Sequence, residues 1–240
     1  MKKQYTFEEF TDIIKELRSE HGCPWDREQT HNSLKPCLSE EAAELLAAIR
    51  IYDTKGNYEN MREELGDILL QVVMHSQIAK EEGLFSIDDV ITEISEKMIR
   101  RHPHVFGDVK ADTAEEVLNN WDDIKKKEKE NQSFIESPFL EIPIELPALT
   151  RATKVLKKQD KLYHDVPSCE EAISELKANI SKMEDILKES ASDKIELEKC
   201  YGKVLLNLSN IAMKNKIAGE QLLVDEIEKI IDKYEVKNGK

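Results

Sequence analysis

Two stretches of the sequence decide the fold: LSEEAAELLAAIR, residues 38–50, and MREELGDILLQVV, residues 61–73. In both, apolar residues recur at three- and four-residue intervals, the spacing that brings side chains to one face of an α-helix. Both stretches also carry carboxylates at the same spacing: Glu40, Glu41 and Glu44 in the first, and Glu63, Glu64 and Asp67 in the second. The sequence therefore predicts two helices in which acidic residues stand among apolar ones.

The apolar residues of these two helices predict a core face. At 100° per residue, the core face of the first helix consists of Leu38, Ala42, Leu45, Leu46 and Ile49. The core face of the second consists of Leu65, Ile68, Leu69 and Val72. We expect these residues to pack in the interior.

The carboxylates of each helix share a separate arc, and that arc is not typical of a face turned to water. It runs on into Ala48 and Ile51 in the first helix, and Leu70 and Met74 flank it in the second. A short turn at 53–57 joins the two helices, so we expect antiparallel packing that can bring the two acidic arcs together.

Facing carboxylates suppress one another's ionisation unless a cation lies between them. No His or Cys stands at ligand spacing among the acids, and a site built from oxygen atoms alone favours Mg²⁺, or Mn²⁺ as a substitute, over Zn²⁺. Acidic clusters are also common on solvated helices. Periodicity alone leaves both interpretations open.

The remaining sequence is mostly helical and divides into two halves. We expect a first helix over 6–20, with Thr6 and Glu9 as a capping box, and a second that begins near Leu38 with Ser39 as its cap. A third helix covers 58–82, a fourth begins after Ser86, and a short fifth helix covers 114–130. The Pro-containing stretch 131–145 is a linker between a domain at 1–130 and a second at 146–240. The second half repeats the first in diverged form, because ELGDILLQV (64–72) is similar to CYGKVLLNL (200–208).

Composition excludes several classes of protein. The formal net charge of -14 argues against nucleic-acid binding, which depends on clustered Lys and Arg. The four cysteines form no Cys-x-x-Cys motif, as expected for reduced thiols in a cytoplasmic protein. No apolar run is long enough for a signal peptide or a membrane span, so we expect no export and no membrane partner.

Several motifs, in order, resemble the MazG family of nucleoside triphosphate pyrophosphohydrolases. These are EExxE at 40–44 followed by ExxD at 64–67, GCPWDREQTH at 22–31, RRHPHVFGD at 100–108, and Trp121 with Lys125 in a W-x-x-x-K pattern. The similarity covers most of residues 5–130, and LPALTRATKVLKK (146–158) is similar to the start of the family's second domain.

The resemblance implies an all-α fold in which a MazG-like domain occurs twice and dimerisation completes the helical bundles. It implies a Mg²⁺-dependent enzyme that hydrolyses a nucleoside triphosphate between the α- and β-phosphates, releasing a nucleoside monophosphate and pyrophosphate. The implied metal ligands are Glu41, Glu44, Glu64 and Asp67, with Glu40 beside them to orient or deprotonate water. Trp25, Arg100, Arg101 and Lys125 are weaker candidates for substrate binding.

The second half departs from the family's pattern. With Gly202 aligned to Gly66, Cys200 stands in the place of Glu64 and Lys203 in the place of Asp67, and the corresponding upstream stretch 176–182 contains no acid. A lysine in place of a ligating Asp repels a cation. We therefore expect the second half to be a catalytically empty repeat.

Two other functions remain as alternatives. The chain could be a non-catalytic regulator that binds a nucleotide or a protein, and metal-dependent product formation would distinguish this from the hydrolase. A di-iron bundle would need paired Glu-x-x-His motifs, and the sequence offers only Glu28 to His31, in a connecting segment.

Overall fold

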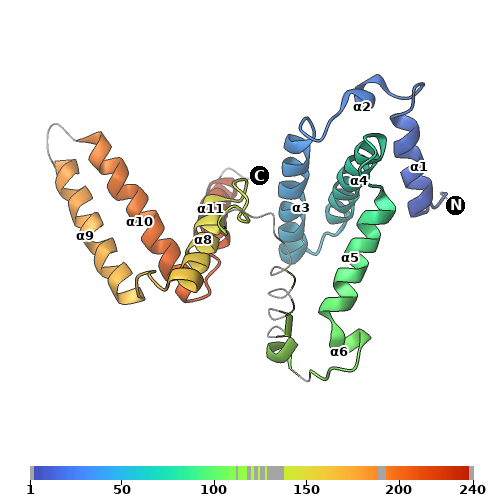
Figure 1. The fold of residues 1–240 in the computed structure, drawn as a ribbon. Helices are drawn as coiled ribbons and strands as arrows, with labels where there is room; N and C mark the ends of the chain where they lie inside the picture. The colour runs from blue at the N-terminus through green and yellow to red at the C-terminus, as the bar shows by residue number, and fades with distance from the viewer. Residues whose placement is uncertain are drawn as a thin grey trace. The chain divides into compact units, whose positions relative to one another are not determined.

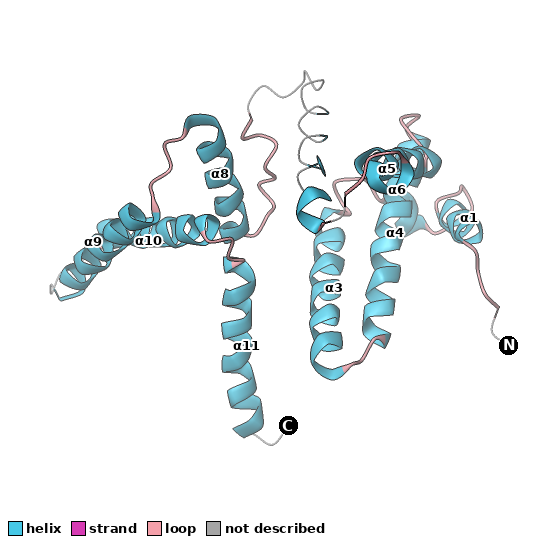
Figure 2. Cartoon of the chain, turned by 90° about the horizontal axis from the view of Figure 1, so that it is seen from below, coloured by secondary structure: helices cyan, strands magenta, loops and turns pink. Residues whose placement is uncertain are grey.

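The computed structural model describes residues 3–111, 113–117, 120, 121, 124, 128, 138–188 and 193–237, and every regular element within them is a helix (Figures 1 and 2). The chain divides into two compact units, Met1–Lys129 and Glu130–Lys240. The predicted all-α fold class is confirmed. Among the described residues, no helix is long and apolar enough to cross a membrane.

The helices of the first unit are α1 (Phe7–Leu17), α2 (Pro24–Glu28), α3 (Lys35–Lys55), α4 (Glu59–Glu81), α5 (Ile87–Arg101) and α6 (Pro103–Phe106). Those of the second are α8 (Ala148–Tyr163), α9 (Cys169–Lys188), α10 (Lys194–Lys214) and α11 (Gly219–Lys237). The helix predicted over 114–130 lies mostly outside the described residues, but those of its residues that are described are helical.

Local signals set most helix ends where the sequence places them. The Thr6 hydroxyl accepts a hydrogen bond from the Glu9 N–H (3.2 Å), and the Glu9 carboxylate accepts one from the Thr6 N–H (3.0 Å). This is the predicted capping box, and Ser86 forms a similar one with Asp89 at the start of α5. Gly83 follows α4 with φ 73°, a left-handed conformation that glycine adopts without strain.

The start of α3 differs from the prediction. The helix begins at Lys35, with Pro36 in its first turn, so Ser39 lies inside the helix and caps nothing. Proline is compatible with this position because the first helical N–H groups have no partner within the helix. The helix also continues to Lys55, through much of the predicted turn, and ends at Gly56 with φ 69°.

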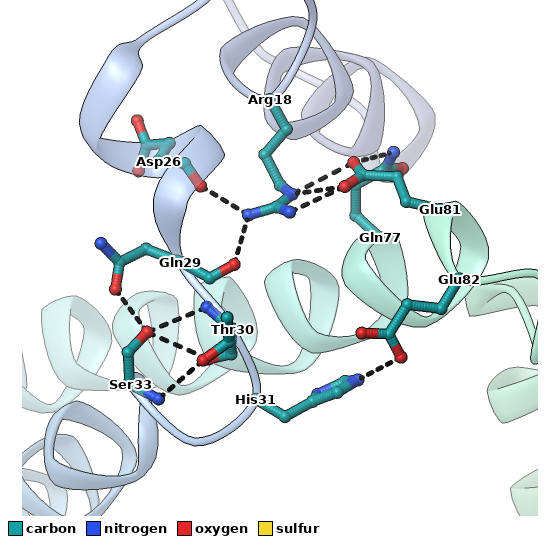
Figure 3. A network of polar contacts seen from close by, with 9 residues as sticks. All are labelled: Arg18, Asp26, Gln29, Thr30, His31, Ser33, Gln77, Glu81 and Glu82. Atoms are coloured by element: carbon teal, nitrogen blue, oxygen red, sulfur yellow. Dashed lines mark hydrogen bonds and ion pairs between the residues drawn. The ribbon is translucent and has the colours of Figure 1, made fainter.

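A buried arginine fixes the segment that leads from α1 into α3 (Figure 3). Arg18 donates hydrogen bonds to both carboxylate oxygens of Glu81 on α4, the shorter at 2.7 Å, and its side chain is only 5% exposed. The same guanidinium donates to the backbone carbonyls of Asp26 and Gln29. Because these contacts tie three segments together, the end of α4 holds the approach to α3 in place.

The core of the first unit lies where α1 and the start of α3 meet the second half of α4. Its buried members are Ile14, Leu34, Val73, Met74 and Ile78. Phe7, Phe10 and Leu17 pack against them from α1, as their helical spacing predicts.

Helices α3 and α4 bury the opposite faces from those predicted. Leu46 and Leu65, expected in the core, are 68% and 52% exposed, and Leu38, Ile49, Leu69 and Val72 are exposed as well. The fully buried residue of α3 is Ala48, on the acidic arc, and α4 buries Glu64 and Gln71. Both faces of each helix carry apolar residues, so periodicity could not decide which face packs within the chain.

The second unit is built around a hairpin of α9 and α10; α8 packs against α10, and α11 packs against α8. The Asp193 side chain caps α10, and Lys182 on α9 pairs with Glu196 on α10. The buried residues of α10 are Cys200, Asn207, Ser209, Asn210 and Ala212. This hairpin therefore buries polar groups and small side chains.

Candidate metal centre

The hairpin of α3 and α4 positions the acidic residues (Figures 1 and 2). Its turn is fixed by Gly56, whose N–H donates to the Tyr52 carbonyl (2.8 Å), and by Asn57, whose side chain accepts from the Glu59 N–H (2.9 Å). Ala48, with no exposed surface, lies on the acidic arc of α3. Because a methyl side chain takes little room, this face of α3 can approach α4 closely.

Three of the predicted ligands come together between the two helices. One carboxylate oxygen comes from Glu41 of α3, one from Glu64 and one from Asp67 of α4. These three oxygens all lie within 4.8 Å of one another. Glu64 is 8% exposed, and Glu41 and Asp67 are half-buried. The structure thus gathers acids from both motifs into one cluster, which we call the acidic cluster.

The surroundings of the cluster disfavour its negative charge. Burial, followed by the nearby Asp67, Glu44 and Glu40 carboxylates, raises the pKa of Glu41 above 4.5. Burial also raises the pKa of Glu64, with further contributions from Glu44, Asp67, Glu63 and Glu41. A bound cation would reverse this effect, because it favours the ionised carboxylates.

The other two predicted acids lie at the edge of the cluster. Glu44 is exposed and is not one of the three residues that share the 4.8 Å group, although its charge acts on both Glu41 and Glu64. Glu40 is exposed too and acts on Glu41. Neither is sequestered, so both can reach a ligand or a water molecule from the solvent side.

The weaker substrate-binding candidates are not gathered at this cluster by any described contact. Trp25 is 60% exposed on α2, so it does not anchor its loop on the core, and Lys125 lies outside the described residues. Arg100 and Arg101, at the end of α5, both pair with Glu128, at 2.7 and 2.6 Å. Hydrogen bonds from Arg101 and then Arg100 lower the pKa of Glu128 to about 2.

Two residues near these sites are not among the predicted site residues. Glu63 contributes to the raised pKa of Glu64, although it lies next to it on an exposed position. Glu128 is the counter-charge of the two arginines, and no motif marks it among the surrounding lysines and glutamates. Only its ion pairs with the two arginines of α5 reveal this role.

The donors of the cluster suit a hard divalent cation. All are carboxylate oxygens, and the protein typically supplies only a few carboxylates to Mg²⁺, with substrate phosphate and water as the other ligands. A divalent ion would offset the unfavourable burial and the mutual repulsion of the three carboxylates. The residues present therefore fit Mg²⁺ or Mn²⁺.

Comparison with known proteins gives a family. Residues 29–106 match the model of the MazG nucleotide pyrophosphohydrolase domain. The chain is 39% identical over 228 residues to the nucleoside triphosphate pyrophosphohydrolase/pyrophosphatase MazG of Thermotoga maritima, covering 95% of this chain and 84% of that protein. It is 37% identical over 201 residues to the nucleoside triphosphate pyrophosphohydrolase of Escherichia coli K12, covering 83% and 74%.

A third relative shares only part of its length with the chain. The uncharacterized protein YabN of Bacillus subtilis is 54% identical over 154 residues, which are 64% of this chain and 30% of that protein. The matched family domain contains both helices of the acidic cluster. Together with the two pyrophosphohydrolases matched along most of their length, these similarities show that the chain belongs to the MazG family of nucleoside triphosphate pyrophosphohydrolases.

Proposed function

We propose that the protein hydrolyses nucleoside triphosphates, ribo or deoxyribo, between the α- and β-phosphates in a Mg²⁺-dependent reaction, and that it serves to clear the nucleotide pool. The observation that carries this proposal is the convergence of Glu41, Glu64 and Asp67 within 4.8 Å inside the matched family domain. The names of the Thermotoga and Escherichia relatives support the reaction class.

In this proposal Glu41, Glu64 and Asp67 hold the cation, and the exposed Glu44 joins them from the edge of the cluster. When bound, the cation polarises phosphoryl oxygens and offsets the charge of the leaving pyrophosphate. Glu40, exposed beside Glu41, orients the attacking water and accepts its proton.

Substrate binding by Arg100 and Arg101 requires a rearrangement. Both guanidiniums are engaged by Glu128, so a triphosphate would have to displace that carboxylate or share the arginines with it. Trp25, exposed on α2, offers a free aromatic face to a base.

A homodimer and an inactive second unit complete the proposal. The outer faces of α3 and α4 expose leucines such as Leu46 and Leu65, and apolar surface of this kind is typical of an interface. We further propose that the second unit is a diverged repeat without metal, because Cys200 and Lys203 occupy the places of Glu64 and Asp67.

Product analysis tests the reaction. The full chain is incubated with Mg²⁺ and a panel of ribo- and deoxyribonucleoside triphosphates, and products are separated into monophosphate plus pyrophosphate or diphosphate plus phosphate. We expect monophosphate and pyrophosphate as the products. The rate of their formation should fall at least about a hundredfold in a Glu41→Gln, Glu64→Gln variant, a loss typical of removing groups that stabilise transition-state charge.

A Glu198→Gln variant, altered at an exposed acid of α10, is the control and should retain full activity. Binding of nucleotide or metal without any turnover would contradict the proposal. It would instead favour the alternative, a catalytically impaired regulator that binds a nucleotide or a protein.

A further inference from the structure

One buried polar group of α4 has no part in the reaction as described so far. Gln71 is 5% exposed, and its amide oxygen has no hydrogen-bond partner among the described residues. A buried acceptor without a partner destabilises the folded state. Such a group is retained where something binds it, or where its removal would cost more.

The position of Gln71 relates it to the acidic cluster. It follows Asp67 by one helical turn and Glu64 by two, so at 100° per residue it lies within about 40° of both around the helix axis. The same face continues with Met74 and Ile78, which belong to the apolar core. Gln71 is therefore the polar residue at which the acidic cluster ends and the core begins.

The residues that share this face of α4 are consistent with an unpaired oxygen. Ionised carboxylates such as Glu64 and Asp67 only accept hydrogen bonds, so they can pair with the amide NH₂ group but not with its oxygen. Met74 and Ile78 offer no donor. A hydrated divalent cation does, because its coordinated water molecules are strong hydrogen-bond donors, and Mg²⁺ retains several of them in protein sites.

We infer that Gln71 is a positioning residue of the metal centre, whose amide oxygen accepts a hydrogen bond from a water molecule held by the cation. This inference rests on the metal-dependent hydrolysis proposed above. It adds a neutral side chain to the carboxylate ligands, and this side chain orients a water molecule bound to the ion. Outer-shell partners of this kind commonly contribute about 10- to 100-fold to metal affinity.

The second unit supplies a matched control. With Gly202 aligned to Gly66, Asn207 on α10 corresponds to Gln71, and it is also buried, at 7% exposure. No acid stands in the places of Glu64 and Asp67 on that helix, where Cys200 and Lys203 are found. Asn207 thus resembles Gln71 in burial and amide chemistry but has no metal centre beside it.

The test measures Mn²⁺ binding to the full chain directly, by titration followed with electron paramagnetic resonance of the free ion. We expect Gln71→Met, which has similar length but no acceptor oxygen, to weaken binding about tenfold. Gln71→Glu, which restores an acceptor, should retain binding, and Asn207→Leu should leave it unchanged. Melting curves of Gln71→Met should be unchanged or shifted upward, since an unpaired amide is replaced by an apolar group.

The possible outcomes separate this inference from the proposed function. Failure of the unchanged protein to bind Mn²⁺ would overturn both. Tight binding by the unchanged protein and equally tight binding by Gln71→Met would overturn only the role of Gln71. If Gln71→Met and a second variant, Gln71→Leu, both failed to fold, the amide would serve packing alone, and the inference would again be wrong.

Discussion

When the α3–α4 hairpin of the first unit is compared with the α9–α10 hairpin of the second, equivalent positions are buried but different groups fill them. Taking Gly66 and Gly202 as equivalent, the buried Glu64 corresponds to the buried Cys200. A thiol packs in an apolar interior as a small hydrophobic group, whereas a carboxyl group is costly there. A hairpin of this plan therefore does not need acids in order to pack.

The same comparison shows how the second hairpin would exclude a cation. Lys203 stands in the place of Asp67 and is exposed, and the stretch 176–182 on α9 contains lysines and no acid. Lys182 instead pairs with Glu196 across the hairpin. The first hairpin keeps a destabilising cluster that the second lacks, and retention of such a cluster is best explained by a ligand.

The largest effect is expected from the feature that the two hairpins share, their exposed apolar faces. Leu46 and Leu65 are 68% and 52% exposed in the first, and Leu206 is 51% exposed in the second. In a two-fold dimer each substitution occurs twice, so Leu46→Glu with Leu65→Glu should weaken association about a hundredfold or more. Analytical ultracentrifugation over a range of concentrations measures this.

A Leu206→Glu variant asks whether the second hairpin also contributes to association. Its dissociation constant would rise if both hairpins lie in the interface. A monomer in the unchanged protein at all concentrations would contradict the proposed dimer, and the exposed leucines would then need another explanation.

The next effect is expected at the position that distinguishes the hairpins. Cys200→Glu places a carboxyl group in the second hairpin without the cation that the first can bind, so we expect the free energy of unfolding to fall by about 2 kcal/mol. Urea unfolding at neutral pH measures the change, and Cys200→Ala is the control for loss of the thiol. Unchanged stability of Cys200→Glu would show that the second hairpin tolerates a buried acid, and the proposed difference between the two hairpins would then be wrong.

Sequence patterns predicted the helices better than their packing. Capping residues such as Thr6 and Ser86 act locally, so the starts of α1 and α5 were correctly placed. The start of α3 was misplaced, because a proline in the first turn and a serine three residues later are both acceptable N-terminal signals. The buried faces predicted for α3 and α4 were also wrong, since each helix has two apolar faces and the sequence does not show which one meets the partner helix.

The candidate site was predictable to the extent that it rests on helix periodicity and a short turn. These two features brought Glu41, Glu64 and Asp67 into one cluster. Periodicity could not show that Glu44 stays at the edge, nor that Gln71 is buried with an unpaired oxygen, because both depend on the distance between α3 and α4. The pairing of Arg101 with Glu128 joins residues distant in sequence and has no local signal.

The smallest of these effects is the pH dependence of the stability of the metal-free protein. Burial raises the pKa of Glu64 above 4.5 in the folded chain, so the folded state binds this proton more tightly than the unfolded state does. Its contribution to stability is fully present below the unfolded pKa and is lost as the pH rises through the folded pKa. In the presence of a chelator, the melting temperature of the unchanged protein should therefore fall, relative to that of Glu64→Gln, as the pH rises from 4.5.

Metal binding should show the opposite pH dependence. The Mn²⁺ affinity should rise by up to about tenfold per pH unit while one proton is released per ion bound. Cys200→Ala, changed at the equivalent position of the second hairpin, should follow the unchanged protein in both measurements. If Glu64→Gln also followed the unchanged protein, the acidic cluster would be solvated and no more costly than the thiol that replaces Glu64 in the second hairpin.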